Sequence, residues 1–177
     1  MPSHPPTRAV ILMGISGTGK STVGKLVSKR MNLPFYDGDD YHSAVNVAKM
    51  ASGQPLNDED RAGWLDSLCG LIREQNAAGK IPIVACSALK TAYRDKLRSA
   101  ADELYFIHLS GSRELIEQRL VQRAKDTDHF MKATLLDSQL DALDDPGAEA
   151  GTLTLDVVKP PDVLSEKVFQ YLQPKFD

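Results

Sequence analysis

The chain has 177 residues, of which 42% are hydrophobic and 25% are charged, with a net charge of −3 at pH 7. This composition is ordinary for one soluble globular domain with a full core, and it argues against a nucleic-acid-binding protein, which usually gathers Lys and Arg on one face. No apolar run approaches the roughly 20 residues of a membrane span, so we expect no membrane partner. Cys69 and Cys86 form no CxxC pair, so we expect neither a disulfide framework nor a zinc site, and a cytoplasmic location.

Apolar runs and helical patterns alternate along the chain after residues 1–7, which we expect to be a disordered tail. In chain order the sequence predicts a strand at 8–13, a helix at 20–31, a strand at 33–37, helices at 41–50 and 58–79, a strand at 81–88, a helix at 90–101, a strand at 104–110, helices at 112–124 and 134–143, a strand at 152–156 and a helix at 161–173. This alternation favours a three-layer α/β/α domain over 8–177, with a five-stranded, mainly parallel sheet and helices on both faces. Ligands of such sheets bind at the carboxyl ends of the strands.

A phosphate-binding loop follows the first expected strand. The stretch "GISGTGKS" (14–21) fits G-x-x-x-x-G-K-[ST] and precedes an expected helix, as that motif requires. Its glycines let backbone N–H groups point at phosphate oxygens, Lys20 reaches the terminal phosphates, and the Ser21 hydroxyl can ligate Mg²⁺. The expected nucleotide-binding residues are Gly14, Ile15, Ser16, Gly17, Thr18, Gly19, Lys20, Ser21 and Thr22.

Carboxylates follow the second expected strand rather than the third. Switch and motor proteins usually end a buried strand with the magnesium-positioning Asp, but "IPIVACSA" (81–88) has none, and no [NT]-K-x-D motif occurs. The acids stand instead in "YDGDD", which indicates a kinase acting on a hydroxyl of a small molecule. Asp39 is the candidate general base and Asp37 the candidate ligand of magnesium-bound water, although an Asp-Gly turn is the alternative. We expect Asp40 to cap the helix that follows.

The segment from 35 to 64 resembles the gluconokinases of the phosphate-loop type. Their pattern, DGDxxHxxxNxxKMxxGxPLxDxDRxxW, is matched here by Asp37, Gly38, Asp39, His42, Asn46, Lys49, Met50, Gly53, Pro55, Leu56, Asp58, Asp60, Arg61 and Trp64. The stretches 86–98 and 129–146 are also similar to family segments. The resemblance implies a nucleoside-monophosphate-kinase type of fold, ATP-dependent phosphorylation of D-gluconate to 6-phospho-D-gluconate and, commonly, a homodimer. Two departures are Ser43, where the family often has Pro, and a longer 124–128 segment.

Gluconate carries one carboxylate and several hydroxyls, so its site needs a cation and polar partners. Arg61 is the best carboxylate clamp, since a guanidinium can bind it bidentately; a salt bridge to Asp58 or Asp60 is the alternative. Lys90, Tyr93 and Arg94 share one helical face and form either a sugar-acid surface or a solvated basic face. The remaining candidates are His42 and Lys49, which bind a hydroxyl or support the Asp cluster. We interpret Trp64 as helix packing.

Two arginines at helical spacing predict a mobile lid over about 119–133. Arg119 and Arg123 lie four residues apart, where like charges repel unless an anion lies between them. We expect both to contact the transferring phosphate, and His129 to lie at the far end of the lid. Two solvated arginines balanced by Glu114 and Glu117 are the alternative. Rival functions are a shikimate-kinase-like enzyme with another hydroxy-acid acceptor, or a nucleotide-binding regulator without transfer activity.

Overall fold

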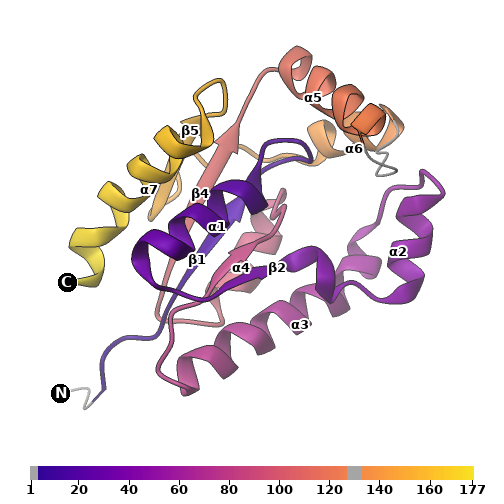
Figure 1. Ribbon diagram of the computed structural model, residues 1–177. Coiled ribbons are helices and arrows are strands. Elements are labelled where there is room, and N and C mark those ends of the chain that lie inside the picture. Colours follow the sequence, from indigo (N-terminus) through magenta and orange to yellow (C-terminus); the bar gives the residue numbers. More distant parts are fainter. Residues whose placement is uncertain (1–3, 127–132) are drawn as a thin grey trace.

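A five-stranded parallel sheet lies at the centre of the computed structural model, which describes residues 4–126 and 133–177 (Figure 1). Across the sheet the strand order is β2-β3-β1-β4-β5, and each neighbouring pair is parallel. The strands are β1 (Arg8–Met13), β2 (Phe35–Asp37), β3 (Ile83–Ala85), β4 (Glu103–Ser110) and β5 (Thr152–Asp156). This order brings the carboxyl ends of β2, β3 and β1 side by side, where ligands of parallel sheets bind.

Helices cover both faces of the sheet, which confirms the predicted α/β/α layers. The helices are α1 (Lys20–Met31), α2 (Ala44–Ala51), α3 (Asp58–Ala77), α4 (Thr91–Arg98), α5 (Arg113–Asp126), α6 (Ala133–Ala142) and α7 (Pro161–Phe176). Because strand side chains alternate between faces, Val10 and Leu12 of β1 pack towards α1 and α7, while Ile11 and Met13 pack towards α3 and α4. In Figure 1, α5 and α6 lie at the top of the molecule, away from both chain ends.

A third apolar cluster joins α5 and α6 to the loop after β1. Ile15 of that loop packs with Ile116 and Leu120 of α5 and with Leu136 of α6. All four side chains are less than a tenth exposed. The phosphate loop is therefore held by apolar contacts from the two helices that flank residues 127–132.

Two elements near the expected site differ from the sequence prediction. β3 spans only Ile83–Ala85, because Pro82 before it has no N–H and Ala88 after it takes a left-handed backbone with φ 47°. A 3₁₀ turn, η1 (Gly38–Tyr41), replaces the start of the expected 41–50 helix. The prediction that Asp40 caps this helix is wrong.

The caps come from two other side chains. Asp37 accepts a hydrogen bond from the Asp39 N–H and so caps η1, whereas the Ser43 hydroxyl accepts from the Asn46 N–H and caps α2. Asp40 lies between these two residues in sequence, and its side chain is exposed. The departure from the family pattern at Ser43 thus supplies a good N-cap residue.

The expected tail ends before Thr7. The Thr7 N–H and hydroxyl both donate to Asp102, each at 2.8 Å, and its carbonyl accepts from the Glu103 N–H. Thr7 therefore extends the pairing of β1 with β4 by one residue. The prediction that the tail reaches residue 7 is wrong at this position.

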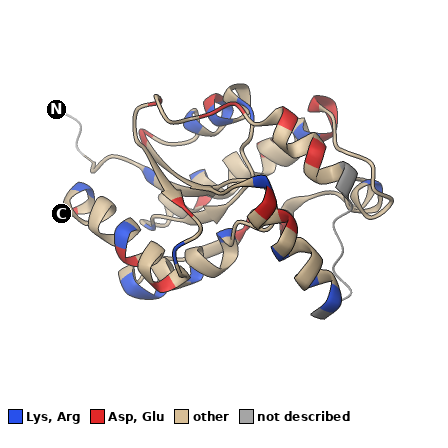
Figure 2. Cartoon of the chain, turned by 90° about the horizontal axis from the view of Figure 1, so that it is seen from above, with Lys and Arg blue, Asp and Glu red and all other residues tan. Residues whose placement is uncertain are grey.

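Charges of both signs are mixed along the helices. Figure 2 shows Lys and Arg interspersed with Asp and Glu on most helices rather than one sign covering the side in view. Within the described ranges, no helix combines the length and apolar character needed to cross a lipid bilayer.

Candidate active site

The phosphate loop turns sharply at Gly14, directly after β1. Gly14 has φ 147°, and a Cβ there would lie 2.6 Å from the Leu109 carbonyl oxygen, so a larger residue would not fit. The Lys20 ammonium donates to the carbonyl oxygens of Gly14 and Ile15 at 2.9 and 3.1 Å. The Thr18 hydroxyl donates to the same Ile15 carbonyl at 2.9 Å. These bonds close the loop on itself and leave its rim facing the cavity.

A cavity of about 330 Å³ lies between this loop, the ends of β2 and β3, and α5. It is lined by Ser16, Gly17, Gly19, Lys20, Ser21, Thr22, Asp37, Asp39, Ala85, Arg119 and Arg123. The candidates for phosphate contact, the acidic residues and the arginine pair thus share one cavity. The expected nucleotide residues Gly14, Ile15 and Thr18 do not line the cavity. They are the buried part of the loop.

Lys20 has a perturbed proton affinity. Burial lowers the pKa of its ammonium, while the Asp39 and Asp37 carboxylates oppose this shift. Cys86, at the end of β3, lies close enough to interact with Lys20, and burial raises the pKa of its thiol to about 12. The Cys86 thiol is therefore neutral at pH 7, and Cys86 is not a nucleophile.

Ser21 and Asp37, the predicted metal-binding pair, are in direct contact. The Ser21 hydroxyl donates to Asp37 Oδ2 at 2.8 Å, and Asp37 Oδ1 holds the Asp39 N–H at 3.0 Å. A hydroxyl and a carboxylate fit Mg²⁺, which usually takes one or two protein oxygens and completes its shell with phosphate oxygens and water. Among the described residues no three His, Cys, Asp or Glu side chains converge on one point.

Asp39 points into solvent from a rigid turn. Its side chain is 82% exposed, and the His42 side chain behind it is 5% exposed, with Nε2 3.9 Å from Asp39 Oδ1. The His42 ring stacks on Trp64 with centroids 4.3 Å apart, and Trp64 Nε1 donates to the Gly38 carbonyl at 2.8 Å. Burial lowers the pKa of His42, which is therefore neutral at pH 7 and supports the turn without an ion pair. The interpretation of Trp64 as packing agrees with its 3% exposure.

A Cβ on Gly38 would lie 2.4 Å from the Ala85 carbonyl oxygen. The turn at Gly38 therefore fits against β3 only because this residue has no side chain. Asp39 follows directly and so keeps its position at the rim of the cavity.

Two lysines of the expected sugar-acid site are paired with acids at the start of α3. Lys49 binds Asp60 at 2.6 Å, and Lys90 binds Asp58 at 2.8 Å. The Tyr93 hydroxyl also donates to Asp58. Asp58 and Asp60 thus fasten α2 and α4 to the same helix end, and Lys49 and Lys90 lie beside it.

Arg61 makes no ion pair within the described ranges. Its guanidinium donates to the Leu56 carbonyl at 2.5 Å, lies 3.4 Å from the Tyr93 hydroxyl and sits over the Tyr93 ring. The alternative of a salt bridge to Asp58 or Asp60 is not seen, since lysines take both carboxylates. A half-buried guanidinium with donors to spare fits a carboxylate-binding role.

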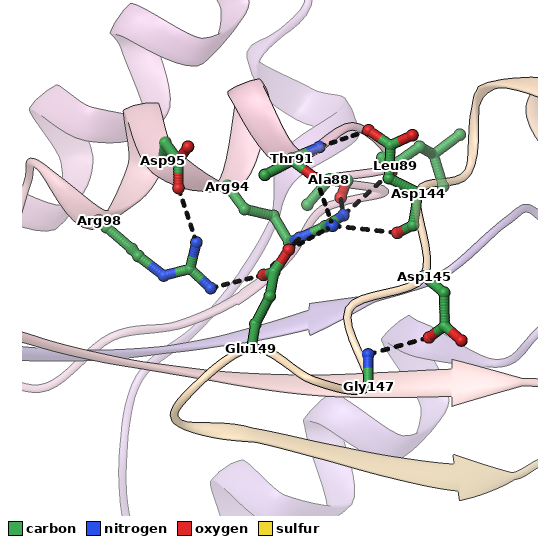
Figure 3. A network of polar contacts seen from close by, with 10 residues as sticks. All are labelled: Ala88, Leu89, Thr91, Arg94, Asp95, Arg98, Asp144, Asp145, Gly147 and Glu149. Carbon is green, nitrogen blue, oxygen red and sulfur yellow. Dashed lines mark hydrogen bonds and ion pairs between the residues drawn. The ribbon is translucent and has the colours of Figure 1, made fainter.

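Arg94 is a correction to the sequence prediction. Its side chain is fully buried, and it binds Glu149 through Nε and Nη2, with the shortest contact at 2.7 Å (Figure 3). It also donates to the carbonyl oxygens of Ala88, Leu89 and Asp144. Arg94 follows Tyr93 on α4, but its side chain points into the core. It is therefore not available to a substrate.

The arginines of the expected lid both line the cavity. Arg119 also donates to the Val157 carbonyl at 2.5 Å, which ties α5 to the turn after β5. Of the lid segment 119–133, residues 127–132 lie outside the described residues, and His129 is among them.

One contact at the loop was not predicted. Gln139 of α6 accepts a hydrogen bond from the Ser16 N–H, although the two residues are 123 positions apart. Only its place in "LLDSQLDAL" (135–143), within a stretch resembling the family, marked this region.

The chain is similar to several known kinases. A family model described as shikimate kinase matches residues 16–145. The thermoresistant gluconokinase of Escherichia coli K12 is 42% identical, with 85% of each chain covered. A crystal structure of a sugar kinase from Janibacter sp. HTCC2649 superposes with a TM-score of 0.89 at 41% identity, covering 95% of both chains. A gluconokinase structure from Sinorhizobium meliloti 1021 gives 0.80 at 35% identity, covering 96% of this chain and 97% of that one.

The family model covers most of the chain, and the relatives include several gluconokinases. With more than 40% identity to a gluconokinase across most of both chains, this chain belongs to the gluconokinase family of P-loop kinases.

Proposed function

We propose that this protein transfers the γ-phosphoryl group of ATP to the primary hydroxyl of D-gluconate, giving 6-phospho-D-gluconate and ADP. The observation that carries the proposal is the shared cavity, which Asp39 lines together with Lys20 and the phosphate loop. The gluconokinase relatives, at about 40% identity, support gluconate as the acceptor.

The acceptor oxygen attacks the γ-phosphorus while the bond from phosphorus to the β,γ-bridging oxygen breaks. Asp39 takes the proton of the acceptor hydroxyl, since its carboxylate is exposed and lines the cavity. Lys20, Arg119 and Arg123 bind the phosphate oxygens on which negative charge accumulates. Ser21 and Asp37 would hold Mg²⁺, which neutralises phosphate charge when it is bound.

Arg61 is the proposed clamp for the gluconate carboxylate. Its guanidinium is half-buried and lies over the Tyr93 ring, so its orientation is already fixed. No described carboxylate forms an ion pair with it. Lys49, Lys90 and His42 are proposed to bind hydroxyls, with the two lysines retaining their acidic partners. His129 is proposed to join them from the lid.

A second candidate is a shikimate-kinase-like enzyme with another hydroxy-acid acceptor. The match to a shikimate kinase model favours it. Shikimate kinases usually carry a glycine triplet after the third strand, where this chain has "CSALK" (86–90), with Ala88 and Leu89 buried. A nucleotide-binding regulator without transfer activity is disfavoured because Lys20, Asp39 and both arginines share one cavity.

An acceptor panel tests these candidates directly. ADP release with gluconate, shikimate, other sugar acids and polyols is measured by a coupled assay with ATP and MgCl₂. Turnover on gluconate well above every other acceptor is expected. Turnover on another acceptor without gluconate activity supports the second candidate, and ATP binding without any transfer supports the regulator.

We also propose a homodimer in the cytoplasm. The dimer rests on the family resemblance, and light scattering coupled to size-exclusion chromatography tests it with an expected mass of twice 19.4 kDa. The location is supported by Cys69 and Cys86, which are both buried free thiols.

A further inference from the structure

We propose that Gln139 is a positioning residue that holds the tip of the phosphate loop from outside the cavity. Its Oε1 accepts from the Ser16 N–H at 2.7 Å, and its Nε2 lies 3.4 Å from the Ser16 hydroxyl. One side-chain amide thus contacts both a backbone donor and a side-chain acceptor of the same loop residue.

The tip of the loop needs such a restraint because the hydrogen bonds that close the loop are made to the carbonyls of Gly14 and Ile15 and not to Ser16. Gly17 and Gly19 both have positive φ, at 85° and 92°, and neither has a side chain to fix its conformation. Ser16 lies between buried Ile15 and Gly17, and its N–H has no partner within the loop. A mobile tip would scatter the backbone N–H groups that must face the phosphates together.

Gln139 contacts Ser16 from outside the cavity. Ser16 and Gly17 line the cavity, but Gln139 does not. On α6 it stands beside Leu136, which packs with Ile15, Ile116 and Leu120. The amide contact therefore adds one directional restraint to an apolar cluster that alone could let the loop slide.

The segment after α6 is itself held in place, so Gln139 has a fixed base. The Asp144 N–H donates to the Leu89 carbonyl at 2.8 Å, and Asp144 Oδ2 accepts from the Thr91 N–H. Buried Arg94 then joins the Asp144 carbonyl to Glu149 (Figure 3). The network in Figure 3 thus anchors the carboxyl end of α6 against α4, and through Gln139 it sets where the loop tip lies.

The inference concerns nucleotide binding. It rests on the proposed function only where gluconate is named as the acceptor. Gln139→Met keeps side-chain length and removes both polar contacts. Losing one half-buried hydrogen bond corresponds to a weakening of about three- to tenfold in affinity for ADP. We expect that loss in calorimetric titrations made without any acceptor, and a similar rise in KM for ATP with KM for gluconate unchanged.

The matched control is Gln170→Met on α7, an exposed glutamine that contacts Glu166. It is expected to bind ADP like the parent chain. Gln139→Glu keeps the oxygen that accepts from Ser16, and about 0.5 M salt screens its added charge from the phosphates. At that salt Gln139→Glu should bind ADP within about twofold of the parent chain. If Gln139 had only a structural role, Gln139→Glu and Gln139→Met would weaken ADP binding equally.

Unchanged ADP affinity in folded Gln139→Met overturns the proposal. Equal weakening in Gln139→Met and Gln139→Glu at high salt also overturns it, and that comparison stands even where one variant is less stable. Absence of gluconate turnover in the parent chain would refute the proposed function and leave the ADP comparison intact.

Discussion

Glu149→Gln removes the carboxylate that partners the buried Arg94 and keeps the side-chain shape. Arg94 is fully buried and Glu149 is 19% exposed, and their guanidinium and carboxylate meet through Nε and Nη2. Arg98 also donates to Glu149 Oε2, at 2.6 Å, an oxygen that Arg94 Nε binds as well. The substitution therefore leaves the buried positive charge of Arg94 without a carboxylate partner.

Two routes give the expected size of the loss. The two arginines lower the pKa of Glu149 from 4.5 to about 2, chiefly through the Arg94 hydrogen bonds. At about 1.4 kcal/mol per pKa unit, this corresponds to about 3 kcal/mol of folding free energy. Removing one partner of a buried pair costs about 3–5 kcal/mol in other proteins, and the glutamine oxygen retains part of the contact. We expect a loss of about 2–3 kcal/mol at pH 7.

Urea unfolding followed by circular dichroism, from pH 7 down to pH 3, measures this loss. Because the folded pKa lies below the unfolded one, the contribution of Glu149 is complete above the unfolded value of about 4.5 and fades as pH falls towards about 2. The gap between the parent chain and Glu149→Gln should therefore be widest at pH 7 and narrow below pH 4.5. Asp95→Asn is the control, since Asp95 binds Arg98 with a side chain 65% exposed and should cost under about 1 kcal/mol.

Two results would refute this reasoning. One is a Glu149→Gln chain within about 0.5 kcal/mol of the parent at pH 7, which would make the buried pair energetically neutral. The other is a stable variant whose KM for gluconate rises sharply, which would return Arg94 to the substrate site from which its burial removes it.

Three further variants test the proposed catalytic roles. Lys20→Ala should lower kcat by at least about 100-fold because it removes the ammonium that we propose binds the transferring phosphate, and a loss under tenfold in the coupled assay would contradict that role. Asp39→Asn should lower kcat by about 10²–10⁴-fold with ADP affinity nearly unchanged, so near-normal turnover would exclude Asp39 as the base. Arg61→Met should raise KM for gluconate about tenfold or more with KM for ATP unchanged, and a polyol lacking the carboxylate should show no such difference between the two chains.

Local sequence was enough for the elements and for the phosphate loop. Alternating apolar runs and helical patterns gave the strands and helices within a few residues, because side-chain period and the Pro and Gly stops are short-range properties. The loop motif and the acids after the second strand could be placed at one sheet edge, since the carboxyl ends of parallel strands share that edge. Lys20, Asp37 and Asp39 do line one cavity.

Tertiary packing decided which charged side chains can reach a ligand and which form internal ion pairs. Arg94 and Arg61 are both helical arginines near Tyr93. Arg94 is buried and paired with Glu149, whereas the Arg61 guanidinium lies over the Tyr93 ring without a described carboxylate partner. The Gln139 contact with Ser16 likewise spans 123 residues. No local pattern encodes such pairs, because they depend on which surfaces the sheet order brings together. The sequence by itself determined the chemistry available at the sheet edge, and only the folded chain decided which of those groups face the cavity.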